Sequence, residues 1–331
     1  MGSIAAELTT ETDQRLEKAR LWLIDLGVEI QSDFLDIAGD ASFRRYFRIK
    51  ADGVSRVLMD APPPGEDVKP FINVAHRLRT AGLHAPDIIH ADWHHGYLLL
   101  EDLGDDLYRG ILDADSVDTL FPALFNILKQ FAQTVDMNDL PAFSAKKLRR
   151  DMDLFPLWYL DRHRSSMPKA EFDRSWDRFC ECIIESALAQ PQCFVHRDFH
   201  SCNLLRKNSD EIGIIDFQDA VIGPLSYDLV SLIWDRYICW PRNKIEAWIE
   251  QFRLDLGLDI TTADWLRYCD LMGLQRNIKI VGIFARLHYR DGKQGYLEMI
   301  PRFYDYVTDT LGRYPEFDDM RKIMEHPECA P

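Results

Sequence analysis

The sequence predicts an α+β fold with a small N-terminal lobe built on an antiparallel sheet and a larger, mostly helical C-terminal lobe. Short β-like runs and one helix fill the first hundred residues, and long amphipathic segments dominate after residue 102. A single β-rich island, residues 193–220, interrupts those segments. We place the lobes at residues 1–102 and 103–331, with a hinge near residues 101–105.

The first lobe reads as strand, strand, helix, strand, strand, preceded by a helix. Charged and apolar residues alternate at helical spacing over residues 11–27 and stop at Gly27. Two β-like runs follow, FRRYFRIK and RVLMDA, joined by the turn-like ADGVS. A helix is predicted over residues 66–81, and the runs APDIIHAD and YLLLEDLG supply two more strands.

The second lobe is predicted to be helical outside the island. Amphipathic spacing indicates helices over residues 113–137, 144–164, 168–189, 241–257, 262–290 and 301–325.

Charge and composition exclude several classes of function. The formal charge of −15 would repel nucleic acids and anionic membranes. No run of eighteen apolar residues is present, and the first thirty residues carry charges throughout, so we expect no membrane span and no secretory signal. Seven cysteines without a CxxC pair indicate reduced thiols rather than a zinc or redox site. We therefore expect a cytoplasmic protein without a nucleic-acid or membrane partner.

The island holds the residues most indicative of chemistry. Asp198 and Asn203 are five positions apart in VHRDFHSCN, and Asp216 follows in IIDFQD. Protein kinases place a catalytic Asp, an Asn and a metal-binding Asp at this spacing. Phosphoryl transfer needs one carboxylate for the attacking hydroxyl and oxygen ligands for magnesium. We therefore assign Asp198 as catalytic, and Asn203 and Asp216 as metal ligands. An HRD triplet alone also occurs by chance, but three matched elements favour function.

His196, His200 and Asp228 each have a structural alternative beside a functional one; for His196 the functional one is a general base, which would compete with Asp198. His196 is interpreted as a buried residue that fixes the loop, and His200 either contacts substrate or caps the turn. Ser226 is a candidate helix N-cap in GPLSYDL. Asp228 is expected to accept hydrogen bonds from loop amides rather than to bind metal.

The motifs HRDFHSCNLL, IGIIDFQDA and GPLSYDLVSLIWD resemble the aminoglycoside phosphotransferase and choline kinase-like small-molecule kinases. This resemblance implies a bilobal protein-kinase-like fold, use of ATP and Mg²⁺, and acceptor binding by helices of the larger lobe. The segments GDASFRRYFRI, VLMDAPPP and YLLLEDLGDDLY, with residues 274–301, further resemble the anomeric amino-sugar kinases of bacterial cell-wall recycling. Those enzymes phosphorylate the 1-hydroxyl of N-acetylmuramate and N-acetylglucosamine.

Two parts of the kinase pattern are missing from the nucleotide side. There is no GxGxxG loop, and no lysine lies between Lys50 and Lys69, so Met59 or Asp60 occupies the place of the third-strand lysine. A magnesium triphosphate still needs cationic donors, and we assign Arg44 and Arg45 to it. Arg48 and Lys50 fit a solvated strand face equally well. We expect the backbone of Glu101 and Leu103 to bind adenine.

The acceptor site is expected along the helix over residues 273–290 and the end of VSLIWDR. Arg286 is our candidate for an acceptor carboxylate, while Arg276, Lys279 and Arg290 also fit a solvated face. Trp234 either stacks on a sugar ring or packs in the core. Two alternatives to an amino-sugar kinase stay open: an aminoglycoside-type or other small-molecule phosphotransferase, and a nucleotide-binding pseudokinase.

Overall fold

The computed structural model describes residues 2–37, 44–163, 169–207, 211–326 and 329–331, with backbone only at residues 2–13 and 169–171. The chain divides into two compact units. The first contains the chain up to Ile111 together with Cys202–Asp219, and the second contains Leu112–Ser201 and Ala220–Pro331. The motif island therefore contributes to both units, since the chain passes from the second to the first between Ser201 and Cys202.

The first unit is built on a five-stranded antiparallel sheet with the order β1-β2-β3-β5-β4. Its strands are β1 (Leu35–Ile37), β2 (Arg45–Ala51), β3 (Val54–Asp60), β4 (Ile88–Asp92) and β5 (Tyr97–Glu101). The helix α2 (Lys69–Thr80), the short 3₁₀ helix η1 (Tyr108–Gly110) and the hairpin of β7 (Leu204–Arg206) and β8 (Ile212–Ile214) complete the unit. The predicted order of strands and helix is confirmed. Phe43, the predicted start of β2, lies outside the described residues.

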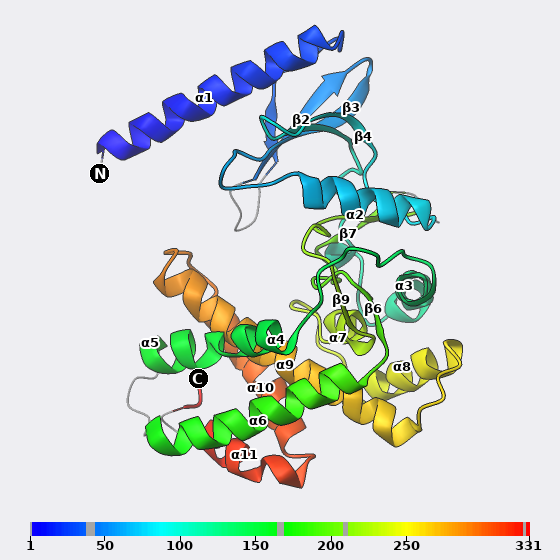
Figure 1. Ribbon diagram of the computed structural model, residues 1–331, viewed down its shortest axis with the longest axis vertical. Coiled ribbons are helices and arrows are strands. Elements are labelled where there is room, and N and C mark those ends of the chain that lie inside the picture. The colour runs from blue at the N-terminus through cyan, green and yellow to red at the C-terminus, as the bar shows by residue number, and fades with distance from the viewer. Residues whose placement is uncertain (1, 38–43, 164–168, 208–210, 327–328) are drawn as a thin grey trace. The chain divides into compact units, whose positions relative to one another are not determined.

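The N-terminal helix α1 (Gly2–Asp25) is longer than predicted, because it begins nine residues before residue 11. Its C-terminal part packs on the sheet through Ala19 and Leu23, which are fully buried against residues of β2, β3 and β5. The preceding part projects beyond the strands of the same unit (Figure 1). The short strand β1 was not predicted, since its three residues are largely exposed and show no apolar alternation.

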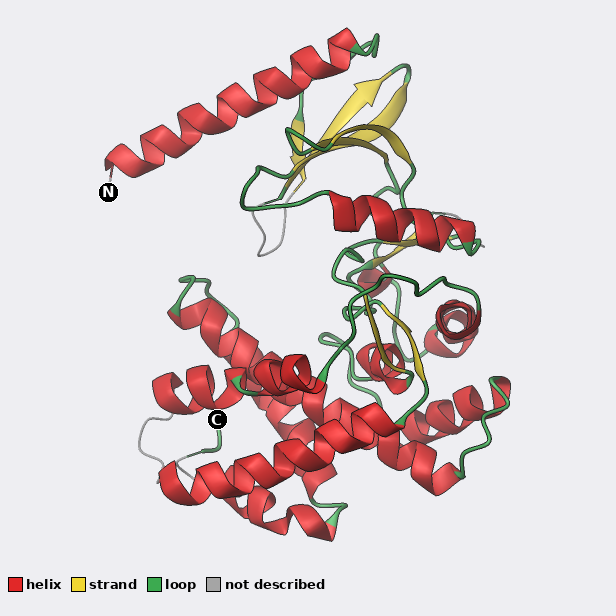
Figure 2. Ribbon diagram, in the orientation of Figure 1, coloured by secondary structure: helices red, strands yellow, loops and turns green. Residues whose placement is uncertain are grey.

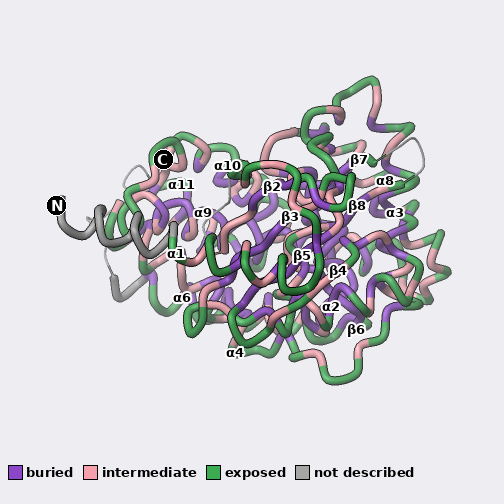
Figure 3. Tube along the Cα trace, turned by 90° about the horizontal axis from the view of Figure 1, so that it is seen from above, coloured by how far each residue is buried: buried purple, intermediate pink, exposed green. Residues whose placement is uncertain are grey.

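In its described residues, the second unit is helical apart from one two-stranded ribbon, β6 (Gln192–Val195) paired with β9 (Val221–Pro224) (Figure 2). Its α-helices are α3 (Val117–Gln133), α4 (Ala145–Met152), α5 (Asp161–His163), α6 (Lys169–Ala189), α7 (Ser226–Ile233), α8 (Arg242–Asp255), α9 (Thr262–Tyr289), α10 (Ile300–Leu311) and α11 (Asp318–Glu325). Helix α9 is central to the unit, and buried residues run along most of its length (Figure 3).

Two predicted helices are interrupted, in both cases near a proline. In the described part of the helix predicted over residues 144–164, the chain forms α4, the π-helix η2 (Phe155–Leu160) and α5, because Pro156 lacks the N–H that a continuous α-helix needs. Residues 301–325 form α10 and α11, separated by the 3₁₀ helix η4 (Pro315–Phe317). A further 3₁₀ helix, η3 (Leu297–Met299), precedes α10.

The observed elements confirm the predicted α+β class, with an antiparallel sheet early in the chain and helices dominating after it. Among the residues described, no helix combines the length and the apolar character that crossing a membrane requires.

Candidate active site

The loop that follows β6 carries Asp198, and α7 holds this loop by hydrogen bonds to its backbone. Asp228, in the first turn of α7, accepts from the amides of His196 (2.5 Å) and Arg197 (3.0 Å). Burial raises the pKa of Asp228 to about 7, although the two N–H donors oppose the shift. The backbone of Arg197 is left-handed (φ 79°), a conformation that costs free energy for a residue with a side chain.

A second aspartate, Asp235, fixes the other end of the same loop. Its carboxylate accepts from the amide of Ser201 at 2.9 Å and from the amide of Tyr237 at 2.8 Å. Asp228 and Asp235 therefore bind the loop from the two ends of α7. The sequence placed Asp235, at the end of VSLIWDR, near the catalytic island but did not predict that it fixes the loop, although an aspartate on either side of the apolar run LVSLIW was a visible signal. Ser226 is not the N-cap of α7, because Leu225 occupies that position and the Ser226 hydroxyl donates to Gln190 Oε1.

The environment of Asp198 keeps its carboxylate ionised. Burial alone would raise the pKa of Asp198, but the cations of Lys279 and Arg236 outweigh burial and hold the pKa well below its ordinary value. Lys279 is itself buried on α9, where its Nζ donates to the Tyr227 hydroxyl at 2.8 Å. A carboxylate with so low a pKa is a weak base, so it is better suited to orient a hydroxyl than to hold a proton.

The two histidines of the loop are both buried. The ring of His196 has no exposed surface, and its Nδ1 accepts from the Asp198 amide at 3.3 Å. His200 donates its backbone N–H to the Asp198 carbonyl at 3.0 Å. Burial, assisted by the nearby cation of Arg236, lowers the pKa of His200 well below its ordinary value. His200 is therefore neutral at pH 7.

The first unit brings Asn203 and Asp216 together. Asn203 Nδ2 lies 3.4 Å from Asp216 Oδ2, and the backbone of Ile215 donates to the Asn203 carbonyl at 3.0 Å. Gln218 Nε2 donates to the other oxygen of Asp216 at 2.9 Å. Asp216, two residues after the end of β8, adopts a left-handed backbone conformation (φ 62°).

The donor set at Asn203 and Asp216 fits Mg²⁺. A half-turn of the Asn203 amide presents Oδ1 beside the carboxylate, and this gives two hard oxygen ligands. Within the described part of the chain, no cluster of three or more His, Cys, Asp or Glu side chains could hold a metal ion by itself. Mg²⁺ in phosphotransfer sites usually takes one or two protein carboxylates and completes its shell with phosphate oxygens and water.

The arginines assigned to the triphosphate have carboxylate partners. Arg45 forms an ion pair with Asp60, directly opposite it in the β2–β3 ladder, and Asp60 also pairs with Arg15 of α1 at 2.5 Å. The Asp60 side chain is fully buried. Arg44 Nε lies 3.6 Å from Glu66. The kinase pattern has a lysine on the third strand. Here the last residue of β3 is instead a buried aspartate, Asp60, that forms ion pairs with two arginines.

Arg48 is not a solvated strand residue, in contrast to Lys50, which is exposed. Its guanidinium donates two hydrogen bonds to Asp102 (2.7 and 3.0 Å) and two to Asp105 (2.7 and 2.9 Å). This double bidentate contact joins β2 to the segment that follows β5. Phe47 and Ile49, on the opposite face of β2, are buried in the core as the alternation of the strand predicts.

The proposed hinge residues lie at the end of β5 and just after it. The Glu101 amide donates to the Asp87 carbonyl at 2.8 Å, and its carboxylate contacts His84 and forms an ion pair with Lys207. Burial alone would raise the pKa of Glu101, but the contacts with Lys207 and His84 outweigh burial and lower it. The Leu103 side chain is buried over Gly213, where a Cβ would lie 2.8 Å from Leu103 Cδ1.

The candidate acceptor residues come from α9 and the end of α7. Arg276 and Lys279 are buried, so the solvated-face alternative is wrong for both. Arg286 is half-buried, and its Nε has no hydrogen-bond partner. Arg290 is exposed and paired with Asp291 at 2.7 Å. Trp234 is 3% exposed, and its ring packs against Gly273.

Comparisons with known proteins identify the family. A model of the phosphotransferase enzyme family matches residues 33–271. The N-acetylmuramate/N-acetylglucosamine kinase of Pseudomonas aeruginosa is 38% identical over 327 residues, which cover 94% of this chain and 96% of that protein. The kinase of the same name from Neisseria meningitidis is 35% identical over 331 residues, covering 94% of this chain and 95% of that one.

Solved structures confirm the bilobal, protein-kinase-like fold class. The choline kinase LicA from Streptococcus pneumoniae superposes with a TM-score of 0.65 at 14% identity, covering 90% of this chain and 99% of that chain. The ADP-bound aminoglycoside phosphotransferase APH(2'')-Ib gives a TM-score of 0.59 at 14% identity, covering 89% and 96%. The predicted resemblance is thus confirmed at the level of sequence and of fold, and the chain belongs to the phosphotransferase enzyme family.

Proposed function

We propose that this protein is an ATP-dependent kinase that phosphorylates the anomeric 1-hydroxyl of N-acetylmuramate and N-acetylglucosamine in the cytoplasm, as a step of peptidoglycan recycling. The observation that carries the proposal is the identity of 35–38% over at least 94% of the chain to three kinases named for these two sugars. A fourth relative of the same name is 29% identical over 82% of the chain.

In the proposed mechanism, Asp198 accepts a hydrogen bond from the sugar hydroxyl and aims its oxygen at the γ-phosphate. The low pKa of Asp198 suits a loose transition state, in which the hydroxyl proton leaves late. His196, Asp228 and Asp235 hold the loop so that Asp198 does not have to be ordered at each turnover. His200, Trp234 and Arg286 remain our candidates for contacts to the sugar.

Asn203 and Asp216 would hold Mg²⁺, which supplies charge neutralisation of the triphosphate when bound. We assign Arg44 and Arg45 to the phosphates, with Asp60 orienting the Arg45 guanidinium. One nitrogen of that guanidinium, Nη1, is buried without a hydrogen-bond partner. The backbone of Glu101 and Leu103 stays our candidate for adenine, and residues 1–102 and 103–331 stay the proposed lobes.

The test is a substrate panel. Purified protein is incubated with ATP, Mg²⁺ and one of N-acetylmuramate, N-acetylglucosamine, kanamycin or choline, and the products are assigned by phosphorus NMR. We expect an anomeric phosphate on both amino sugars and none on kanamycin or choline. A 6-phosphate, or turnover of kanamycin alone, would overturn the proposal.

Two variants test the mechanism within the same assay. Asp198→Ala removes the carboxylate that orients the hydroxyl, so we expect turnover to fall by at least about 100-fold while ATP still binds. Asp305→Asn is the matched control, because Asp305 is an exposed aspartate of α10. Undiminished sugar-phosphate formation by Asp198→Ala would remove Asp198 from the mechanism.

An aminoglycoside-type phosphotransferase is the second candidate, because the net charge of −15 suits polycationic acceptors and solved structures of such enzymes share this fold. The cations around Asp198 argue against an aminoglycoside acceptor, since they would repel a polycationic substrate. A pseudokinase that binds nucleotide without turnover is a third candidate. The presence of Asp198, Asn203 and Asp216 favours an active enzyme, and single-turnover phosphorylation with labelled ATP separates the two.

A further inference from the structure

Arg236 and Arg276, both near Asp198, have buried nitrogens without a hydrogen-bond partner. Arg276, on α9, is 1% exposed; its Nη1 donates to the Trp234 carbonyl at 3.1 Å, but its Nε and Nη2 have no partner. Arg236 is half-buried, and its Nε is also without a partner. A buried, charged donor that is left unpaired loses its hydration without compensation, so such nitrogens are expected to meet a ligand.

Both arginines are fixed by their surroundings. Arg236 follows Asp235, the residue that holds the Ser201 amide, and its own carbonyl accepts from Arg302 at 2.7 Å. Its guanidinium lies over the ring of Phe284 on α9, at 5.8 Å from the centroid. Arg276 is fixed by its bond to the Trp234 carbonyl, two residues before Arg236. The two guanidinium groups are therefore held by the same segment and the same helix, as a preorganised binding site requires.

The local charge favours an anion. Arg236 and Arg276 act electrostatically on each other and on both Asp198 and His200, and Arg276 also interacts with Asp235, so all five groups lie in one neighbourhood of the second unit. The Asp235 carboxylate already accepts hydrogen bonds from the amides of Ser201 and Tyr237. Lys279, the other buried cation of this neighbourhood, already donates to Tyr227. In a chain with a net charge of −15, a buried concentration of arginine is unusual unless it serves a negatively charged partner.

We infer that Arg236 and Arg276 form a receptor for the carboxylate of an acidic acceptor sugar, and that this receptor sets the preference for N-acetylmuramate over N-acetylglucosamine. The inference rests on the proposed function. The two arginines belong to the same unit as Asp198, the residue that contacts the acceptor in the proposed mechanism. A carboxylate can take two N–H donors from such groups at once. Of the two sugars, only N-acetylmuramate carries a carboxylate.

The experiment compares kcat/KM for the two sugars in four variants. Arg236→Gln and Arg276→Lys remove or displace donors of the receptor. Arg286→Gln tests the arginine that the sequence suggested for the same role. Arg290→Gln is the control, because Arg290 lies on the same helix but is exposed and paired with Asp291. We expect the ratio of N-acetylmuramate to N-acetylglucosamine to fall about 10- to 100-fold in the first two variants and to stay unchanged in the control.

Three results would overturn the receptor. An equal loss for both sugars would assign the arginines to the phosphoryl group, which both reactions share. An unchanged ratio would make them structural, and a ratio that falls only in Arg286→Gln would move the receptor to Arg286. Should Arg276→Lys fail to fold, Arg236→Gln decides alone, since its side chain is only half-buried.

Calorimetric binding of each sugar without ATP separates this inference from the proposed function. A wild-type protein that phosphorylates neither sugar would refute the proposed function. The receptor would then still be supported if N-acetylmuramate binds more tightly to the wild type than to Arg236→Gln, and refuted if the two bind it equally.

Discussion

At the scale of single residues, the loop of Asp198 depends on aspartates that have opposite titration behaviour. Asp198 lies among cations and has a lowered pKa, while burial raises the pKa of Asp228 to about 7. The two carboxylates interact with each other unfavourably, which is one of the causes of the raised value. Asp198 is thus ionised throughout the neutral pH range, whereas Asp228 titrates within this range.

The titration of Asp228 gives a prediction for stability. Because its pKa is higher in the folded than in the unfolded protein, the folded state binds the proton more tightly between about pH 4 and pH 7. The free energy of unfolding should therefore fall as the pH rises through this range, by up to about 4 kcal/mol from this group alone. Asp228→Asn should flatten this slope in urea titrations at a series of pH values, while Asp305→Asn should leave it intact. Parallel curves for wild type and Asp228→Asn would refute the assignment.

Much of the candidate site could be predicted residue by residue, because its motifs are local in sequence. Asp198, Asn203, Asp216 and Asp228 stand at fixed distances along one short stretch. Arg236, Arg276 and Lys279 lie in segments where the acceptor site was expected, but they were given no role, since nothing in a periodic pattern tells a buried cation from a solvated one. Burial of a charge depends on which segments pack around it, and only the folded structure shows that the end of α7 covers this part of α9.

At the scale of elements, α9 shows how a helix and its neighbours determine each other. Gly282 lies where the chain between α4 and η2 crosses the helix, and a Cβ there would come within 2.4 Å of the Leu154 carbonyl carbon. The break in the predicted helix over residues 144–164 therefore has a second cause besides Pro156. The backbone at Leu154 lies directly on α9, and glycine is the residue that permits this approach.

Gly282→Ala should destabilise the second unit although alanine is the better helix former. The clash is with backbone atoms, which cannot rotate away, so we expect a loss of about 1–3 kcal/mol or more in the free energy of unfolding. Gly312→Ala is the matched control. Gly312 ends α10 with φ −63°, and its nearest contacts would be at an ordinary 3.5 Å. The control should be neutral or more stable. Equal urea midpoints for the two variants would refute the close approach of the Leu154 backbone to Gly282.

The sequence located most elements, because apolar periodicity reports which face of a segment is buried. It failed where an element is short or lacks an apolar face, as in β1, and where two segments looked continuous, as over residues 301–325. In that second case apolar spacing continues on both sides of Pro315, so the pattern alone does not reveal the change of direction.

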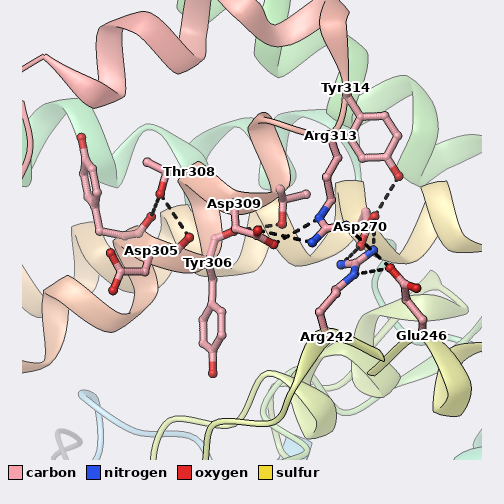
Figure 4. Close-up of polar contacts among 11 residues, drawn as sticks. Arg242, Glu246, Asp270, Asp305, Tyr306, Thr308, Asp309, Arg313 and Tyr314 are labelled. Carbon is pink, nitrogen blue, oxygen red and sulfur yellow. Dashed lines mark hydrogen bonds and ion pairs between the residues drawn. The ribbon is translucent and has the colours of Figure 1, made fainter. Parts of the chain in front are cut away.

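At the scale of the whole molecule, a polar network joins three helical regions of the second unit (Figure 4). Asp270 of α9 is 1% exposed and accepts two hydrogen bonds from Arg242 of α8 at 2.6 and 2.7 Å. The Tyr314 hydroxyl, beyond α10, donates to the same carboxylate at 2.8 Å. Burial, together with this carboxylate, raises the pKa of Tyr314, so the hydroxyl keeps its proton.

Removing the centre of this network should cost far more than removing its edge. Asp270→Ala leaves the Arg242 cation and the Tyr314 hydroxyl without their acceptor, and we expect a loss of about 3–5 kcal/mol in the free energy of unfolding. Arg313→Ala, which breaks an exposed pair with Asp309 in the same close-up, should cost less than about 1 kcal/mol. Similar losses in the two variants, measured by urea denaturation, would mean that Asp270 is not the centre of the network.

The left-handed backbone at Asp216 has a consequence for protein engineering. A carboxylate occupies a position where glycine would fold with less strain, so stability and activity make opposite demands on the residue. Redesign that optimises the thermal robustness of this chain from backbone compatibility alone would choose glycine at position 216. The redesigned protein would be more stable to heat but would lack the proposed metal ligand. Directed evolution of this enzyme therefore needs a selection for turnover as well as one for thermal stability.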